Sequence, residues 1–324
     1  MESYEVANPS ASESLDTLSL RNEIDGMFEE VIGDEGELDL SILTEITDKQ
    51  AESISKHEWN VNLSNLKSIT DRQAEILSKH KWGLRLWLET ITDKQAEFLS
   101  KHTWWYLWLM DLKSITDKQA EFLIGEANVS YLETITDRQA ELFLKEWNIF
   151  LASLKRITDR QAEILSKCDG DLDMFGVELT DKQMDILSRH KWNFLSFWSD
   201  QTLTEAWAEY LSKYKWKLYL WFDRITSMNQ LSLLLEHEWD LELSNLDSLT
   251  DEQFRFLLNL IKEGKYKYNL NITMENVTDS QLKILYESWL LKSWFRFGEY
   301  YSNIIIRAWM TEKQKDIYNW CLNS

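Results

Sequence analysis

One pattern of apolar and polar positions repeats along most of the chain. Each copy begins with an apolar residue, here named the anchor, followed by Thr and, three residues after the Thr in most copies, by Gln, as in ITDKQAE at residues 46–52. Most neighbouring anchors are 22 to 24 residues apart. The anchors are Ile46, Ile69, Ile91, Ile115, Ile135, Ile157, Leu179, Leu203, Ile225, Leu249 and Val277, with a degenerate copy at Met310. Such an array predicts a repeat protein with no room for a separate catalytic domain.

Each copy predicts the start of a helix. In the first copy, Thr47 is the expected N-cap residue, and its side chain can accept a hydrogen bond from the backbone N–H of Gln50. The Gln50 side chain can reach back to the N–H of Thr47, which completes a capping box. Asp48 falls in the first turn, where the positive end of the helix dipole favours an anion. In the copy that begins at Ile69, we expect the helix to continue to about His80.

A short stretch of alternating apolar and variable residues follows each helix. Residues 84–88, LRLWL, show this alternation, which is typical of a strand. The same alternation occurs at residues 61–63, 107–109, 218–220 and 241–243. A strand and a helix together fit a repeat of about 20 to 29 residues, whereas a pair of helices needs about 33 to 47. The predicted fold class is therefore α/β, a solenoid of strand–helix units with a parallel strand ladder.

Two stretches resemble a known repeat family. Residues 61–69, VNLSNLKSI, and 241–249, LELSNLDSL, are similar to the LxLxxNxL core of leucine-rich repeats. The chain from about Leu38 to Leu322 resembles bacterial leucine-rich-repeat-like arrays, in which LTDEQAEALSKH-type helices alternate with LxL strands. Asn65 and Asn245 stand one place early for the asparagine ladder of that family, and most units have no Asn there. The resemblance implies a bacterial repeat protein that binds through a concave strand face.

The repeat divides the chain into four predicted parts. Residues 1–12 are expected to form a flexible acidic tail, and residues 13–36 a helical cap at the N-terminal end of the solenoid. The solenoid covers residues 37–288, and residues 289–324 form an irregular terminal repeat and C-terminal cap. The first 35 residues contain ten acidic side chains and one basic side chain. An acidic arm that binds a partner is the alternative interpretation of this opening segment.

The middle residue of each LxL strand is predicted to face the concave surface, because its two Leu neighbours point into the core. This row consists of Asp39, Asn62, Arg85, Trp108, Asn128, Phe150, Asp173, Ser196, Tyr219, Glu242 and Asn271, with Trp87 and Trp221 beside it. Exposed aromatic and arginine side chains are typical anchors of protein-binding patches. The predicted partner-binding residues are Arg85, Trp87, Trp108, Phe150, Tyr219 and Trp221.

Two alternatives concern the same aromatic residues. The chain contains 17 Trp residues, and burial between neighbouring coils is the expected position for most of them. If the rings are exposed, they could instead bind a glycan, because flat rings can stack on sugar faces. Protein binding is the first hypothesis and glycan binding is the second.

Histidine and cysteine, which often form catalytic or metal sites, occur at one fixed position of the repeat. His57, His80, His102 and His190 each follow their anchor by eleven residues, and His237 follows by twelve. At the end of a helix, a His can interact with the last carbonyl groups. Cys168 and Cys321 occupy the same slot and are expected to be repeat variants, since two Cys residues make no disulfide framework. We expect no metal site and no cofactor.

No catalytic constellation is visible, so we expect a protein that is not an enzyme. The acidic run at residues 169–173, DGDLD, lacks the Gly and Glu spacing of a calcium loop, and a solvated turn is the favoured interpretation. A hydrolase hidden in the C-terminal units is the remaining alternative, with Glu299, Asp316 or Cys321 as candidates.

Charge and hydropathy limit the class of partner. The net charge of −20 and a pI of about 4.7 argue against binding to nucleic acid. No run approaches 18 consecutive apolar residues, and the opening residues do not resemble a secretory signal. We therefore expect a cytoplasmic monomer that binds another protein and does not enter a membrane.

Overall fold

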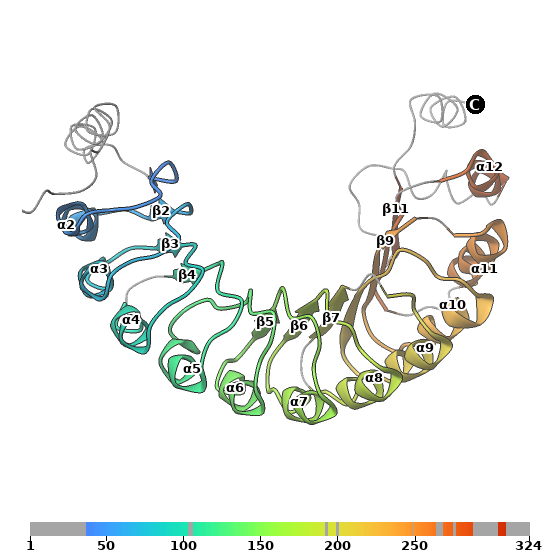
Figure 1. The fold of residues 1–324 in the computed structure, drawn as a ribbon. Coiled ribbons are helices and arrows are strands. Elements are labelled where there is room, and N and C mark those ends of the chain that lie inside the picture. Colours follow the sequence, from blue (N-terminus) through green and yellow to red (C-terminus); the bar gives the residue numbers. More distant parts are fainter. Residues whose placement is uncertain are drawn as a thin grey trace, which may run out of the picture. The chain divides into compact units, whose positions relative to one another are not determined.

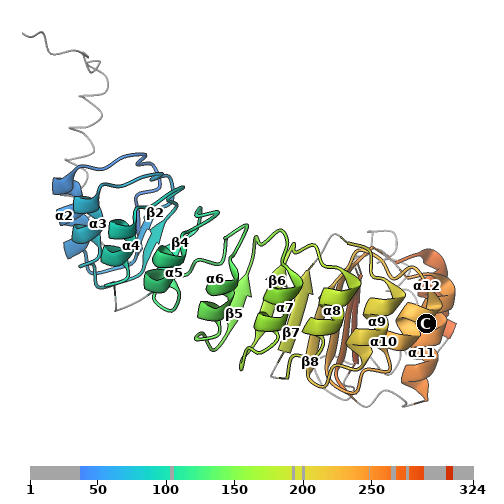
Figure 2. The same cartoon turned by 60° about the horizontal axis from the view of Figure 1, so that its bottom comes forward.

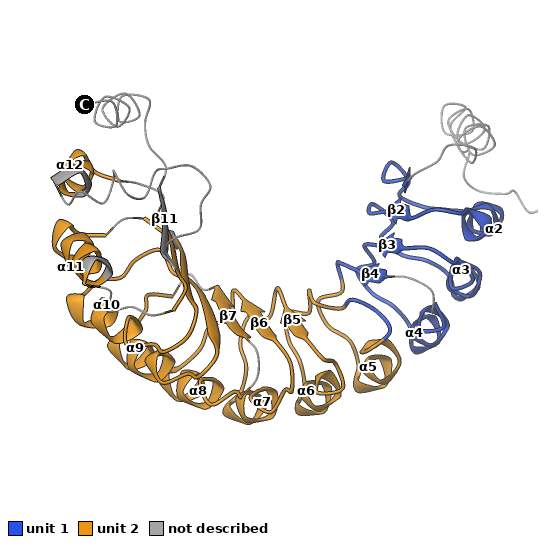
Figure 3. Cartoon of the chain, turned by 180° about the vertical axis from the view of Figure 1, so that it is seen from behind, with its two compact units in different colours: residues 1–111, 126–128 blue, residues 112–125, 129–324 orange. Residues whose placement is uncertain are grey.

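The computed structural model describes residues 37–102, 106–191, 194–198, 201–247, 249–263, 268–274, 277–287 and 304–308. These residues belong to two compact units (Figure 3): unit 1 contains residues up to 111 together with 126–128, and unit 2 contains residues 112–125 and those from 129 onward. The predicted acidic tail and N-terminal cap lie outside the described residues, as do residues 289–324 of the predicted terminal repeat and C-terminal cap, apart from 304–308. The same is true of the candidate hydrolase residues Glu299, Asp316 and Cys321.

Strands and helices alternate along both units, as the repeat predicts. Unit 1 contains β1 (Leu38–Asp39), α2 (Asp48–Lys56), β2 (Val61–Leu63), α3 (Asp71–Leu77), β3 (Leu84–Leu86), α4 (Asp93–Leu99) and β4 (Leu107–Leu109). Unit 2 begins with α5 (Asp117–Leu123), α6 (Asp137–Phe143), β5 (Ile149–Leu151), α7 (Asp159–Leu165), β6 (Leu172–Phe175), α8 (Asp181–Leu187) and β7 (Phe194–Trp198). It continues with α9 (Glu205–Ser212), β8 (Lys217–Trp221), α10 (Met228–Leu234), β9 (Leu241–Leu246), α11 (Asp251–Lys262), β10 (Leu270–Met274), α12 (Asp279–Glu287) and β11 (Ile304–Ala308).

The strands of each unit form one parallel sheet. In unit 1 the order is β1-β2-β3-β4, and in unit 2 the strands from β5 to β11 follow one another in sequence order. Within each unit, the helices lie on one side and the strands on the other (Figures 1 and 2). The predicted fold class, an α/β repeat with a parallel strand ladder, is confirmed. None of the described helices is long and apolar enough to cross a membrane.

The flanking Leu residues of each LxL strand form the core. Leu84 and Leu86 of β3 are fully buried, whereas Arg85 between them is partly exposed. This alternation recurs because successive side chains of a strand point to opposite faces of the sheet. From the helix side, the Ala of each anchor motif packs into the same core, with Ala74 and Ala96 fully buried. The middle residues of the strands therefore lie on the face of the sheet that points away from the helices, here named the outer face.

One predicted strand is missing. Asn128 forms only an isolated bridge with Trp108, although its backbone bonds Leu107 and Leu109 as a strand residue would. Ile115 and Ile135, the anchors on either side, are only 20 residues apart, so this copy is shorter than its neighbours. The prediction of one strand in every copy is therefore wrong here, because the shortened copy retains its helix and loses the length for a strand.

Capping boxes begin the helices. Thr47 and Gln50 make both expected hydrogen bonds, at 3.2 and 2.8 Å, and the same pair recurs in most described copies. The copy at Ile225 differs, because its N-cap is Ser227 and the capping box pairs Ser227 with Gln230. The one-residue delay explains why His237 follows its anchor by twelve residues instead of eleven.

The helices also end earlier than expected. In the copy that begins at Ile69, α3 ends at Leu77, and the predicted continuation to His80 is wrong. The backbone N–H groups of Lys79 and His80 donate to residues three positions earlier, at 3.1 and 3.0 Å. This tightened turn is typical of helix ends. It leaves the His80 side chain fully buried.

The capping Gln also connects neighbouring coils. Gln73 Nε2 donates to the carbonyl of Ile46, the preceding anchor, at 2.7 Å, and Gln161 does the same to Ile135 at 2.8 Å. A buried carbonyl without a partner would cost about 1 to 3 kcal/mol. Equivalent bonds are made by Gln95, Gln139, Gln183, Gln230, Gln253 and Gln281. One amide side chain therefore caps its own helix and holds the previous coil.

Candidate functional site

Four aromatic rings pack against one another on the outer face of the unit 2 sheet. We name Phe150, Phe175, Trp198 and Trp221 the aromatic cluster. Phe175, Trp198 and Trp221 are register partners on β6, β7 and β8, so they stand side by side at the strand spacing. The ring centres are 5.4 Å apart for Phe150 and Phe175, 5.5 Å for Phe175 and Trp198, and 5.6 Å for the two Trp residues. The angles between ring planes range from 60° to 85°, which is edge-to-face packing.

The cluster is exposed although its rings support each other. The exposed fractions are 40% for Phe150, 41% for Trp198 and 37% for Trp221, whereas the core Leu residues beneath them are essentially buried. Single exposed apolar residues are normal on protein surfaces, but contiguous exposed apolar groups mark binding surfaces. Because the rings stand on paired strands, the ladder fixes their positions.

The carboxyl group of Asp173 lies beside the aromatic cluster, and that of Asp171 lies at the entry of the same strand. Asp171 and Asp173 are two residues apart along β6 and its entry, and Asp173 is the register partner of both Phe150 and Ser196. The Oδ1 atoms of both Asp residues are buried and accept no hydrogen bond from the described groups. Burial raises the pKa of Asp173 to about 6, and the nearby Asp171 charge acts in the same direction, while a hydrogen bond from Ser196 opposes them.

Unit 1 has a smaller aromatic surface of its own. Trp108 on β4 stacks on Tyr106 with ring centres 5.6 Å apart. The guanidinium of Arg85 lies over the Trp108 ring, with Cζ 4.7 Å from the ring centre. Trp87, the residue that follows β3, is 39% exposed.

The predicted site residues are thus distributed over two units. Arg85, Trp87 and Trp108 lie in unit 1, where Arg85 and Trp108 are in contact. Phe150 and Trp221 belong to the aromatic cluster of unit 2. Tyr219 lies on β8 beside the cluster and packs on Phe194, with ring centres 5.2 Å apart.

Sequence reasoning missed Phe175 and Trp198, although they link the other rings of the cluster. It considered the middle residue of each LxL motif and, beside that row, only Trp87 and Trp221. Strands β6, β7 and β8 are longer than three residues, so the position two residues further along also points outward. The spacing of Trp198 and Trp221, 23 residues, was the available signal, because it equals the repeat length.

The expectation that most Trp residues are buried is wrong for the part of the chain that the structure describes. Only Trp207 is buried among the described Trp residues. A second aromatic series occupies the turns after the helices: Trp59 and Trp82 stack at 5.8 Å in unit 1, and Trp216 and Trp239 lie 5.3 Å apart in unit 2. The repeat places each of these rings at the surface, where the chain leaves the helix side.

The five histidines form a buried series after the ends of their helices. His102 Nε2 donates to the carbonyl of Trp82 at 2.9 Å, and His190 Nε2 donates to Gly170 at the same distance. Both acceptors belong to the preceding coil, because the tightened turn directs the ring inward. Burial, with the nearby His102 as a smaller cause, lowers the pKa of His80 to about 4.

Other residues share the histidine slot in unit 2. Cys168 is buried and has a free thiol, and burial raises its pKa. Tyr214 stacks between His190 and His237, with ring centres 6.4 Å from each. Among the described residues, no group of three or more His, Cys, Asp or Glu side chains is arranged to hold a metal ion.

The acidic run at residues 169–173 does not form a solvated turn throughout. Gly170 is buried against the coil before it, and a Cβ atom there would lie 1.3 Å from the Trp147 carbonyl oxygen. Asp173 lies on β6, facing outward. The run therefore includes one position that accepts only Gly, at Gly170, and ends with an acidic side chain on the sheet surface, that of Asp173.

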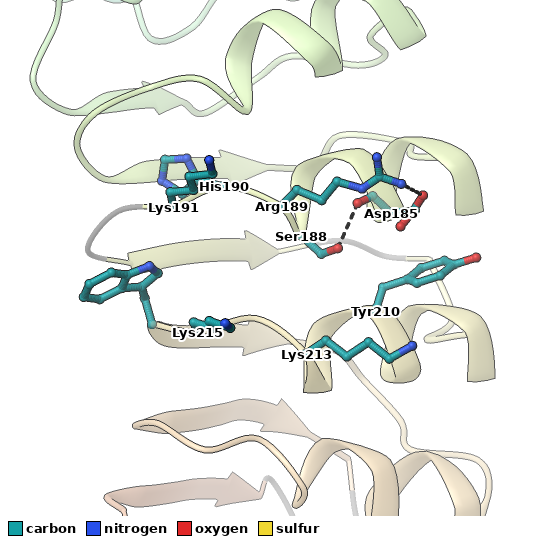
Figure 4. A pocket seen from close by; sticks show the side chains of 9 residues that line it. Asp185, Ser188, Arg189, His190, Lys191, Tyr210, Lys213 and Lys215 are labelled. Carbon is teal, nitrogen blue, oxygen red and sulfur yellow. Dashed lines mark hydrogen bonds and ion pairs between the residues drawn. The ribbon is translucent and has the colours of Figure 1, made fainter.

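A basic groove of about 440 Å³ lies at the C-terminal ends of α8 and α9 (Figure 4). Arg189 pairs with Asp185, and Lys213 pairs with Glu209 at 2.7 Å. A matching groove of about 410 Å³ lies between α3 and α4 and includes Lys79. Because the groove recurs at the same repeat position, and because cations are favoured at helix C-termini, it is a property of the repeat. It singles out no ligand.

Comparison with models of known protein families found no match, and comparison with curated proteins found no significant similarity.

Proposed function

We propose that this chain is a non-enzymatic binding protein whose partner, another protein, contacts the outer strand face at the aromatic cluster of unit 2. The observation that carries the proposal is a connected set of four rings, of which Phe150, Trp198 and Trp221 remain exposed. Trp and Tyr rings at well-packed positions contribute most of the binding energy in many protein interfaces. The cluster therefore supplies the aromatic anchors that such an interface requires.

The placement of the rings favours binding over a structural role. The core of each coil already contains buried Leu and Ala side chains, including Leu172, Leu195 and Leu218 of the strands that carry the cluster. The rings pack on one another and are not part of this core. Replacement of the rings should therefore change the free energy of unfolding only slightly and should weaken partner binding strongly.

We also propose that the repeat is of the leucine-rich type, as the LxL strands suggest, and that the protein acts as a cytoplasmic monomer in a bacterial cell. The parallel ladder and the strand–helix alternation support the first of these points. The second rests on the sequence alone.

Glycan binding by the same surface is the second candidate. It is favoured by Asp173, because sugar hydroxyls donate hydrogen bonds to carboxylates beside aromatic rings. The inclination of the two Trp planes, 60°, disfavours it, because the rings do not form one flat platform. A glycan array with no binding would dismiss this candidate.

The test compares partner capture by three forms of the protein. Wild type, Trp198→Ala/Trp221→Ala and the control Trp239→Ala would be used to capture proteins from the lysate of the native host. Trp239 matches Trp198 in its exposed fraction, 41%, but lies in the turn series. Circular dichroism would establish that all three are folded. We expect a specific partner to be lost only with the double variant, and retention of every captured protein would refute the proposal.

A further inference from the structure

The strand face of unit 1 contains an arginine held between an aromatic ring and a carboxylate. Arg85 and Trp108 are register partners on β3 and β4, and the guanidinium lies over the ring. Arg85 Nη1 is also 2.8 Å from a carboxylate oxygen of Glu37. A cation within about 6 Å of an aromatic ring centre is attracted by the ring quadrupole. Unit 1 therefore provides a cation for its own aromatic and acidic strand face.

Unit 2 has the corresponding rings and carboxyl groups without a cation among them. Phe150 and Asp173 are register partners, as Arg85 and Trp108 are in unit 1. Within strands β5 to β9, Lys217 is the only basic residue. Its Nζ lies 3.8 Å from the carboxylate of Asp240.

Three basic residues on this sheet or at its edge pair with carboxylates outside the aromatic cluster. Lys217 precedes Trp221 by four residues, which corresponds to about 13 Å along a strand. Arg156 pairs with Glu178 at 2.7 Å, and Arg224 pairs with Asp247 at 2.9 Å. The rings of the aromatic cluster and the Asp173 carboxyl group therefore have no described cation of this chain beside them.

We propose that the aromatic cluster and Asp173 bind an arginine side chain from a basic segment of the protein partner. This inference rests on the proposed function and specifies the chemistry of the partner. The guanidinium would lie against the rings, as Arg85 lies against Trp108, and would donate hydrogen bonds to Asp173. Asp173 is partly exposed and stands next to Phe150 in the ladder, so its carboxyl group can be reached from the surface on which the rings lie.

Arginine fits this surface better than lysine does. A guanidinium is planar, stacks on aromatic rings and donates hydrogen bonds in the plane that a carboxylate can accept. It is also less strongly hydrated than an ammonium group, so its transfer from water to the binding surface costs less free energy. The net charge of −20 would attract a basic segment over longer distances and increase its association rate.

The probe is a fluorescein-labelled peptide in which arginine alternates with glycine and serine. A matched peptide contains citrulline in place of arginine, which keeps the planar side chain and removes the charge. Binding to the full chain would be measured by fluorescence anisotropy at physiological ionic strength, where distant surface charges are screened. We expect saturable binding of the arginine peptide, at least about tenfold tighter than that of the citrulline peptide.

Variants locate the binding on the molecule. Trp198→Ala and Phe175→Leu are each expected to weaken arginine-peptide binding about three- to tenfold, the range of a single cation–aromatic contact. Phe175→Leu retains an apolar side chain and removes only the ring, so it remains informative if an alanine variant unfolds. Asp173→Asn should weaken binding by a similar factor. The controls Trp239→Ala and Asp137→Asn should have no effect.

Three results would overturn the inference. They are equal affinity for the arginine and citrulline peptides, equal weakening by the control variants, and the absence of saturable binding. If partner capture still depends on Trp198 and Trp221 in any of these cases, the binding surface remains and only its cationic ligand is wrong. If capture is also unaffected, the proposed function fails as well.

Discussion

Gln201 hydrogen-bonds both backbone groups of Leu179. Its Oε1 accepts from the Leu179 N–H at 2.6 Å, and its Nε2 donates to the Leu179 carbonyl at 3.1 Å. In most other copies, the carbonyl of an anchor accepts a hydrogen bond from the capping Gln of the following copy, as the Ile46 carbonyl does from Gln73. The capping Gln is absent from α9, where Trp207 occupies its position. Gln201 thus compensates, from outside the helix, for a substitution within the capping box.

Gln201→Ala should lower the free energy of unfolding by about 1 to 3 kcal/mol, because it leaves the Leu179 carbonyl and N–H without their partner. The exposed neighbour Thr202→Ala should change it by about 0.5 kcal/mol or less. Urea unfolding would give the two values, and hydrogen exchange at the Leu179 amide would locate the effect. Equal losses in the two variants would show that the Gln201 bonds contribute nothing.

Gly170→Ala should destabilise unit 2 by about 3 kcal/mol or more, because the added Cβ would meet the Trp147 carbonyl oxygen at 1.3 Å and the turn would have to move. The matched change is Gly176→Ala. Gly176 has a φ of +69° but open space around it, so we expect a cost of about 1 kcal/mol from backbone strain alone. Thermal unfolding of both variants would establish the order, and a larger loss for Gly176→Ala would contradict the structure at this turn.

Asp173→Asn should stabilise the protein at neutral pH. The folded-state pKa of about 6 lies above the ordinary value of 3.8, so folding favours the protonated acid. The contribution of Asp173 is fully present below about pH 4 and is lost as the pH rises through 6. At about pH 7.5 the variant should gain roughly 1 to 2 kcal/mol, allowing for partial exposure, and near pH 4 it should gain nothing.

The control for this prediction is Asp169→Asn, at an exposed position in the same acidic run. Unfolding free energies would be measured for all three proteins across this pH range. A gain for Asp173→Asn that is the same at pH 4 and pH 7.5 would mean that ionisation of Asp173 is not its cause.

His80 should make unit 1 sensitive to acid. Its folded-state pKa of about 4 lies below the ordinary value of 6.5, because burial disfavours the charged ring. The neutral ring therefore stabilises the fold above pH 6.5, and this contribution is lost as the pH falls toward 4. It amounts to about 2 to 3 kcal/mol.

The matched variant is His80→Tyr, because Tyr214 occupies the same slot in unit 2 and does not titrate in this range. Its unfolding free energy should fall less than that of wild type between pH 6.5 and pH 4. If both proteins lose stability in parallel, His80 is not the group responsible.

The repeat predicted the fold because the residues of each copy determine the local structure of that copy. Thr47 and Gln50 specify where a helix starts, and the alternation at Leu84 to Leu86 specifies a buried strand. These signals depend only on residues within a few positions of each other. The missing strand at Asn128 was harder to predict, since it results from the total length of one copy.

The second role of Gln73 could not be inferred from its own copy. A capping box accounts for its Oε1 atom, and only the position of the preceding coil shows that Nε2 donates to Ile46. The candidate site was predicted in part for the same reason. Phe150 and Trp221 were identified from their places in single strands, but Phe175 acquires its importance from three rings on other strands.

The bond from each capping Gln to the preceding anchor also has a direction. Where the capping Gln is present, a donor of one coil meets an acceptor of the coil before it, as Gln161 meets Ile135 and Gln183 meets Ile157. Such a head-to-tail interface joins two different surfaces, so it can repeat from coil to coil. Duplication or deletion of a whole coil would reproduce the same junction, so the length of the array can evolve without the invention of a new contact.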